Sequence, residues 1–198
     1  MDVVNAIVLV AYAVLGLELR FMSVPSSVST RQLLRRPRAR SFSAKLALVL
    51  PIVLINGLFL LPLLVALAPR VIGHLMPIGL PQPGARLLGV LLLIPGCAVT
   101  PLSILPLRRA LDQGQLATSG IFAWSRNPIL MGMYTFYLGN WLIAPTAVTA
   151  VGFAFYLAYM HTRVLMEEAD LRERCPVQYA EYAARVPRYL GLRPRRAR

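Results

Sequence analysis

The chain has 198 residues, of which 57% are hydrophobic and 15% charged, and its formal net charge is +13. A soluble domain is typically about 45–50% apolar and about 25% charged, so this composition excludes an ordinary soluble globule. A nucleic-acid-binding protein would explain the charge but not the hydrophobicity, and we expect no nucleic-acid partner. A membrane protein with its basic residues on one side explains both.

Four apolar runs are candidates for membrane helices, since a span needs about 20 mostly apolar residues, and the first run is short by this measure. They cover residues 3–17, 46–69, 87–107 and 127–160. Prolines within the second run predict kinks, and prolines within the third predict breaks in the helix. These residues are Pro51 and Pro62 in the second run and Pro95, Pro101 and Pro106 in the third.

The last run is too long for one span. Its 34 residues would form a helix of about 51 Å, whereas the hydrocarbon core is about 30 Å thick. Ala144, Pro145 and Thr146 predict a tight turn, because proline ends one helix and can begin the next. The sequence therefore predicts five spans, the last two forming a hairpin.

The basic residues support this count and predict an orientation. With five alternating spans, nineteen basic residues lie on one side, and only Arg70 and Arg86 lie on the other. The nineteen are Arg20, Arg31, Arg35, Arg36, Arg38, Arg40, Lys45, Arg108, Arg109, Arg126, Arg163, Arg172, Arg174, Arg185, Arg188, Arg193, Arg195, Arg196 and Arg198. The positive-inside rule then places the C-terminus in the cytoplasm and the N-terminus outside. Four spans would place the nine C-terminal charges outside.

These observations predict an all-α polytopic membrane helix bundle with a C-terminal helical hairpin and a cytoplasmic tail helix. Residues 1–198 form one membrane domain, with three N-terminal spans in 1–107 and the hairpin and tail in 108–198. The expected location is a membrane, with a bacterial inner membrane favoured. We expect no metal site, because His74 and His161 have no partners at ligand spacing. The sequence leaves the oligomeric state open.

The segment 118–128, TSGIFAWSRNP, is the first candidate for function. Gly120 permits a tight turn, and Pro128 suits the first turn of a helix. The start of that helix exposes backbone N–H groups to a polar or anionic ligand. An interfacial turn anchored by Trp124, with a snorkelling Arg126, is the alternative interpretation.

Two further segments carry polar side chains at helical spacing. The first segment places four side chains along one face of a helix, namely Tyr156, Tyr159, Arg163 and Glu167. This pattern indicates either a polar pocket at the membrane surface or an ion pair at the end of the helix. Beyond Pro176, the tail predicts a short helix with an aromatic face, either a lid or an interfacial helix.

Three motifs in this order resemble the isoprenylcysteine carboxyl methyltransferase family of integral membrane methyltransferases. The first is TSGIFAWSRNPILMG at 118–132. The second follows the pattern R-x-x-x-E-E-x-x-L, and the third follows Y-x-x-Y-x-x-R-V-P. The second matches Arg163, Glu167, Glu168 and Leu171, and the third matches Tyr179, Tyr182, Arg185, Val186 and Pro187. The resemblance covers about 75 residues, from 116 to 190.

The resemblance implies an S-adenosylmethionine site, with S-adenosylhomocysteine as product. The implied cofactor-binding residues are Leu116, Ala117, Phe122, Asn127, Pro128, Ile129, Leu130, Met131, Glu167, Tyr179 and Tyr182. Arg163 and Glu167 are the implied catalytic residues, Arg163 at the substrate carboxylate and Glu167 at the polar end of the cofactor.

The expected reaction is methyl transfer to a lipophilic or lipidated acceptor at the membrane–cytoplasm interface, with isoprenylcysteine-like O-methylation favoured. Phospholipid N-methylation, thiol S-methylation and a non-catalytic membrane protein are the alternatives. A thiol or amine acceptor must lose a proton, for which Glu167, Glu168 and His161 are the nearby candidates. Asn127 and Leu130 replace a histidine and a tyrosine of the family pattern, which leaves the acceptor open.

Overall fold

The computed structural model describes residues 3–21, 63–64, 67 and 83–190. In this part of the chain the protein is all-α and contains no strand, so the all-α part of the predicted fold class is confirmed there. Nearly all of the second expected span, 46–69, lies outside the described residues.

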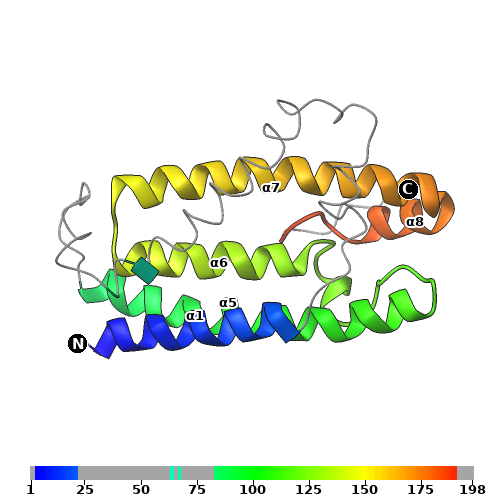
Figure 1. Ribbon diagram of the computed structural model, residues 1–198. Coiled ribbons are helices and arrows are strands. Elements are labelled where there is room, and N and C mark those ends of the chain that lie inside the picture. Colours follow the sequence, from blue (N-terminus) through cyan, green and yellow to red (C-terminus); the bar gives the residue numbers. More distant parts are fainter. Residues whose placement is uncertain (1–2, 22–62, 65–66, 68–82, 191–198) are drawn as a thin grey trace, which may run out of the picture.

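The described part consists of five α-helices and one 3-10 helix. In chain order they are α1 (Val3–Phe21), α5 (Pro83–Asp112), η2 (Gly120–Ala123), α6 (Pro128–Ile143), α7 (Ala147–Arg174) and α8 (Pro176–Arg185). Figure 1 shows α1, α5, α6 and α7 side by side, with α6 between α5 and α7. The short α8 lies at the C-terminal end of α7.

The predicted hairpin between the last two long helices is confirmed. Helix α6 ends at Ile143 and α7 begins at Ala147, so the turn occupies the three expected residues. The hydroxyl of Thr146 accepts a hydrogen bond from the Thr149 backbone N–H at 3.1 Å, and the Thr149 hydroxyl accepts one from the Thr146 N–H at 3.3 Å. This reciprocal capping satisfies two donors that the start of α7 would otherwise leave unpaired.

The expected breaks in the third apolar run are wrong. Pro95, Pro101 and Pro106 all lie inside α5, which continues for 30 residues. Membrane helices tolerate proline where neighbouring helices and local adjustments satisfy the freed carbonyls. Within the described residues, α5 is also the one helix long and apolar enough to cross a membrane. The described helices therefore establish one candidate span rather than the expected five.

Helices α5 and α6 pack closely because glycines line their contact. A Cβ on Gly89 would lie 2.6 Å from the carbonyl oxygen of Gly139, and one on Gly96 would lie 2.8 Å from the Cα of Phe136. At Gly132, a Cβ would meet the Val99 side chain at 2.9 Å. Small residues at these positions let the two backbones approach, as is common between membrane helices.

Helix α1 packs against α5 and α6 through buried aliphatic and aromatic side chains. Val8 and Tyr12 are buried in one cluster with Leu93 of α5 and Phe136 of α6. The Tyr12 and Phe136 rings meet edge to face, with centroids 5.0 Å apart. The three helices thus share one core.

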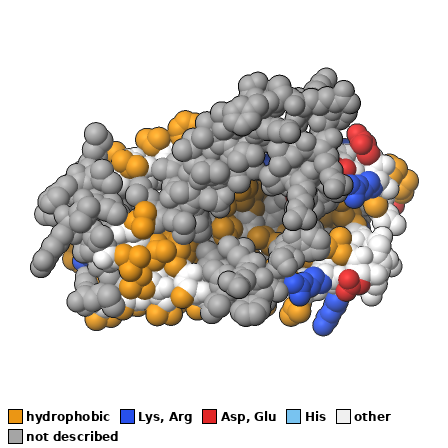
Figure 2. Space-filling view, viewed as in Figure 1, with side chains coloured by type: hydrophobic (Ala, Val, Ile, Leu, Met, Phe, Trp, Pro, Cys, Tyr) orange, Lys and Arg blue, Asp and Glu red, His pale blue; other side chains and the backbone are white. Residues whose placement is uncertain are grey.

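The outer surface separates apolar from charged side chains. Large hydrophobic side chains are exposed on α5 and α7, among them Leu87, Leu91, Ile94, Leu102, Leu105, Val151 and Phe155. Figure 2 shows charged side chains gathered mainly at one end, where α8 lies in Figure 1. Between residues 83 and 190, every charged residue except Arg86 belongs to one of four neighbouring segments. They are the C-terminus of α5, the start of α6 with the loop before it, the C-terminal half of α7, and α8 with the residues around it. We call the end of the molecule that they form the charged end.

Candidate functional site

The loop that enters α6 has the local structure that its sequence predicts. Gly120 adopts a positive φ of 63°, a conformation that glycine takes without strain, and begins the 3-10 turn. Pro128 occupies the first turn of α6, with Asn127 at the N-cap. The side chain of Asn127 does not cap its own helix, and its amide donates instead to the carbonyl of Arg188 at 3.1 Å.

The residues after α8 therefore lie against the start of α6. The backbone N–H of Arg126 donates to the carbonyl of Pro187 at 3.0 Å, and the hydroxyl of Ser125 donates to the carbonyl of Arg188 at 3.3 Å. Three separate donors thus fix this strap of chain, residues 186–190, over the N-terminus of α6.

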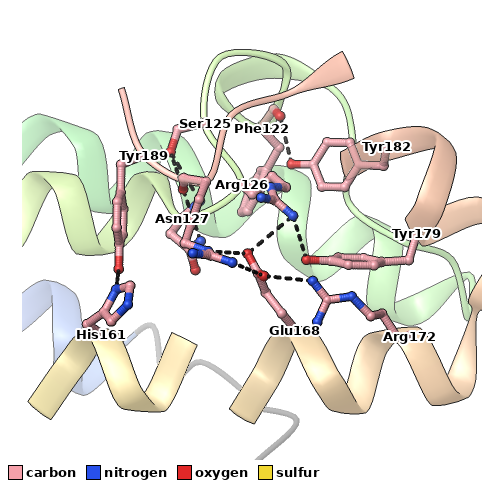
Figure 3. A network of polar contacts seen from close by, with 11 residues as sticks. Phe122, Ser125, Arg126, Asn127, His161, Glu168, Arg172, Tyr179, Tyr182 and Tyr189 are labelled. Carbon is pink, nitrogen blue, oxygen red and sulfur yellow. Dashed lines mark hydrogen bonds and ion pairs between the residues drawn. The ribbon is translucent and has the colours of Figure 1, made fainter. Parts of the chain in front are cut away.

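Glu168 of α7 is the electrostatic centre of this assembly (Figure 3). Its side chain is 4% exposed, and Arg188 binds it with two hydrogen bonds, Nε to Oε1 at 2.9 Å and Nη2 to Oε2 at 2.8 Å. Arg126 lies 3.2 Å from Oε1 and Arg172 lies 3.2 Å from Oε2. One buried carboxylate therefore joins the loop before α6, helix α7 and the strap.

The arginines also keep this carboxylate ionised. Burial alone would raise the pKa of Glu168, but the hydrogen bond from Arg188 and the charges of Arg126, Arg188 and Arg172 outweigh it. The pKa of Glu168 consequently lies below its ordinary value of 4.5. The hydrogen bond to Glu168 likewise raises the pKa of Arg188.

The predicted aromatic face of α8 packs inward. Tyr179 and Tyr182 are 1% and 3% exposed and form a cluster with Val186 and the half-buried Leu116. The Tyr179 hydroxyl accepts a hydrogen bond from Arg126 Nη1 at 2.8 Å. The Tyr182 hydroxyl donates to the carbonyl of Phe122 at 2.8 Å (Figure 3).

The structure therefore brings most of the residues implied by the resemblance to one end of the molecule. Leu116, Phe122, Tyr179 and Tyr182 meet through packing and hydrogen bonds, while Asn127 anchors the strap. Ala117 is buried, and residues 127–131 form the start of α6. Whether these residues contact a cofactor stays a prediction.

On α7, the buried stripe differs from the polar stripe expected from sequence. Tyr156, Val164 and Glu168 are buried, whereas Arg163 and Glu167 are half-buried beside them. Sequence reasoning assigned Glu167 to the cofactor site, whereas it named Glu168 only as a motif position and as one of three candidate proton acceptors. The available signal was the period of the helix, because Tyr156, Val164 and Glu168 are spaced by eight and four residues.

An open apolar pocket of about 480 Å³, called the cavity below, lies between α6, α7 and the strap. Its lining consists of Met131, Tyr134, Leu157, Ala158, His161 and Tyr189. Met131 belongs to the cofactor set implied by the resemblance, so the cavity adjoins that set. Sequence reasoning did not assign Tyr134 or Tyr189 to a site.

His161 and Tyr189 meet at the edge of this cavity. Nδ1 of the imidazole lies 2.8 Å from the Tyr189 hydroxyl (Figure 3). The Tyr189 ring also lies against that of Tyr134, with centroids 6.3 Å apart. The strap held by Glu168 thus brings a tyrosine into the wall of the cavity.

A comparison with known protein families matches a segment of the chain that contains part of this site. Residues 106–174 match the family model described as phospholipid methyltransferase, a segment that runs from the last turns of α5 to the end of α7. No curated protein and no solved structure matched the chain. Over residues 106–174, the chain thus resembles the phospholipid methyltransferase family, the integral membrane methyltransferases that include the isoprenylcysteine carboxyl methyltransferases.

Proposed function

We propose that this protein transfers a methyl group from S-adenosylmethionine to a lipophilic acceptor at the membrane–cytoplasm interface. The observation that carries the proposal is the apolar cavity that adjoins the start of α6 and the charged end. Apolar side chains suit the tail of a lipid, and the neighbouring polar end suits a charged cofactor. The family match supports methyl transfer as the reaction class.

The residues at the start of α6 fit the amino-acid part of such a cofactor. Nε of Arg126 is buried and makes no hydrogen bond among the described residues, and the first turn of any helix offers backbone N–H donors. These donors suit a carboxylate. Glu167, half-buried on α7, would hold the cationic amino group, and Met131 would lie between cofactor and cavity. When bound, S-adenosylmethionine supplies a methyl group activated by a sulfonium.

The protein's own contribution would be positioning and the exclusion of water. Methyl transfer requires the acceptor atom, the methyl carbon and the departing sulfur to lie in line, and fixed geometry alone can supply several kcal/mol. The strap, bound by Asn127 and Glu168, covers the start of α6 and walls the cavity with Tyr189. With cofactor and acceptor bound, this strap would limit the access of water to the reacting atoms from one side.

We further propose five membrane spans with the charged end in the cytoplasm. The exposed apolar side chains of α5 and α7 would face lipid, and the basic residues would lie on the cytoplasmic side. A lipophilic acceptor would then enter from the bilayer, and the water-soluble cofactor from the cytoplasm.

Two acceptor chemistries remain for this site. The sequence motifs favour an isoprenylcysteine-like carboxylate, with Arg163 as its partner, and the family description favours a phospholipid amine. The purified protein in lipid nanodiscs, given methyl-labelled S-adenosylmethionine, would test both. We expect label in the organic extract with phosphatidylethanolamine or with N-acetyl-S-farnesylcysteine as acceptor. Alkali releases methanol from a methyl ester but leaves an N-methyl group intact.

Absence of extractable label with either acceptor, together with no calorimetric binding of S-adenosylhomocysteine, would contradict the proposal. Glu167→Gln is expected to weaken cofactor binding. Glu173→Gln, an exposed carboxylate near the end of the same helix, is the matched control and should bind normally.

A further inference from the structure

The cavity holds a pair of titratable side chains that the proposed function does not yet use. His161 lies on α7 and Tyr189 on the strap, and both line the cavity. Nδ1 of His161 is 2.8 Å from the Tyr189 hydroxyl. Nε2 of His161 makes no hydrogen bond within the described residues.

The lining also lacks a group that would bind an anion permanently. Among the described residues, its ionisable side chains are His161 and the tyrosines Tyr134 and Tyr189, and none of these lining residues is an arginine or a lysine. An acceptor carboxylate in this cavity would therefore meet no fixed positive charge, whereas a neutral nucleophile would be accommodated without one.

The other proton-accepting candidates are less suitable in this structure. Glu168 is buried under three arginines, and its pKa is lowered, so it has little tendency to take a proton. Glu167 does not line the cavity. Of the three candidates indicated by the sequence, His161 is the one whose side chain lines it.

We propose that His161 is a catalytic proton acceptor, oriented by Tyr189, for an acceptor whose nucleophilic atom carries a proton, such as a lipid amine or thiol. With the Nδ1 proton directed to the Tyr189 oxygen, Nε2 carries the free lone pair. The acceptor nitrogen or sulfur forms a bond to the methyl carbon, and the carbon–sulfur bond of the methyl donor breaks with its electron pair on sulfur. The acceptor's proton passes to Nε2 of His161.

Tyr189 is a positioning residue in this scheme. Burial raises the pKa of Tyr189, so its phenol stays neutral and can hold one imidazole tautomer. Because Arg188 binds Glu168 through two hydrogen bonds, the neighbouring Tyr189 is fixed relative to α7. The Glu168 cluster thereby supports the orientation of His161.

The inference rests on the proposed function, and its test uses the intact chain in nanodiscs with two acceptors compared. His161→Asn keeps a donor near Nδ1 for Tyr189 but cannot accept a proton. We expect it to lower the rate with phosphatidylethanolamine by about 100-fold or more, the usual scale of general-base catalysis. The rate with N-acetyl-S-farnesylcysteine and the affinity for S-adenosylhomocysteine should not change.

Two further variants separate chemistry from folding. His161→Ala should regain rate when imidazole is added, and Tyr189→Phe should lose only about three- to tenfold, because the base remains but is poorly oriented. Thr162→Ala, at the exposed neighbouring position, is the matched control and should behave like the unmodified protein.

The outcomes distinguish the two proposals. Full activity of His161→Asn on the amine, or activity of the unmodified protein on the carboxylate alone, would overturn the role of His161 and leave the proposed function standing. No product from the unmodified protein with any acceptor, and no cofactor binding, would overturn the proposed function itself.

Discussion

Helix α6 has two interfaces that differ in kind. Against α5 it presents Gly132 and Gly139, and the two backbones come so close that a methyl group would collide with the partner helix. Against α7 it presents Tyr134 and Tyr137, whose rings pack on Phe153 and Tyr156 at 4.9–6.4 Å between centroids. At the first interface, glycines let the two backbones pack directly on each other. At the second interface, large aromatic side chains lie between the helices.

The difference explains where the cavity forms. Aromatic side chains hold α6 and α7 apart over the middle of the hairpin, and beyond Tyr156 the chain offers Leu157 and the small Ala158. Tyr189 from the strap lines one side of the space left there. Close packing on one face of α6 thus provides a rigid support, while wide spacing on the other face makes room for an acceptor.

The largest loss of stability is expected from placing a side chain in the close contact between α5 and α6. Gly96→Val would place a side chain 2.8 Å from the Phe136 backbone, and we expect destabilisation of about 3 kcal/mol or more. Gly84→Ala on the same helix is the control, because its Cβ would meet nothing within 4 Å. Reversible unfolding in mixed micelles would measure both. Equal stability of the two variants would contradict the close packing of α5 and α6.

Loss of the central carboxylate should come next. Glu168→Gln leaves three arginines without their shared anion, and we expect the protein to lose about 2 kcal/mol of stability. The loss stays this small because the side chains of Arg172 and Arg188 are 54% and 32% exposed, so that solvent screens their charges. Limited proteolysis should then cut the strap faster. Glu173→Gln should change neither the stability nor the rate of cleavage. An unchanged cleavage rate in Glu168→Gln would contradict the proposal that Glu168 holds the strap in place.

The hairpin turn should respond less strongly. Thr146→Ala removes the N-cap of α7 and should cost about 1 kcal/mol, because the bond from the Thr149 N–H at 3.1 Å is lost. Thr162→Ala removes an exposed hydroxyl that bonds its own helix, and its effect should stay within about 0.5 kcal/mol. Thermal unfolding of the two variants measures the difference.

The contribution of Glu168 to stability should also depend on pH. A carboxylate whose folded-state pKa is lowered stabilises the protein above its unfolded value, here 4.5, and the stabilisation is lost as the pH falls through the folded value. Below pH 4.5, the melting temperature of the unmodified protein should therefore approach that of Glu168→Gln. A constant difference between pH 6 and pH 3 would show that Glu168 does not have a lowered pKa.

The sequence predicted the elements whose signals are local. Pro128 and Pro176 begin helices as expected, and the turn at 144–146 divides the last apolar run. The region of the motifs, 116–190, also overlaps most of the segment 106–174 that the family model matches. The continuity of α5 through Pro95, Pro101 and Pro106 was not predicted, because a proline's effect in a membrane helix depends on its neighbours.

The centre of the site could not be read from local pattern alone. Glu167 and Glu168 are adjacent and chemically identical, and only the packing of α7 decides which one turns inward. Two of the three arginine partners of Glu168 are distant in sequence, since Arg126 lies 42 residues before it and Arg188 lies 20 residues after it. Such contacts follow from the path of the strap, which no periodicity in the sequence indicates.

The most direct test of the account is to fill the cavity without touching the cofactor end. Ala158→Phe places a ring in the cavity, whereas Ala154→Phe adds the same ring one turn earlier on α7, at an exposed position outside the lining. We predict that Ala158→Phe lowers methyl transfer to membrane lipid by about tenfold or more, a barrier increase of about 1.4 kcal/mol, with normal binding of S-adenosylhomocysteine. Ala154→Phe should retain full activity. Equal activity of the two variants would show that the acceptor does not bind between α6 and α7.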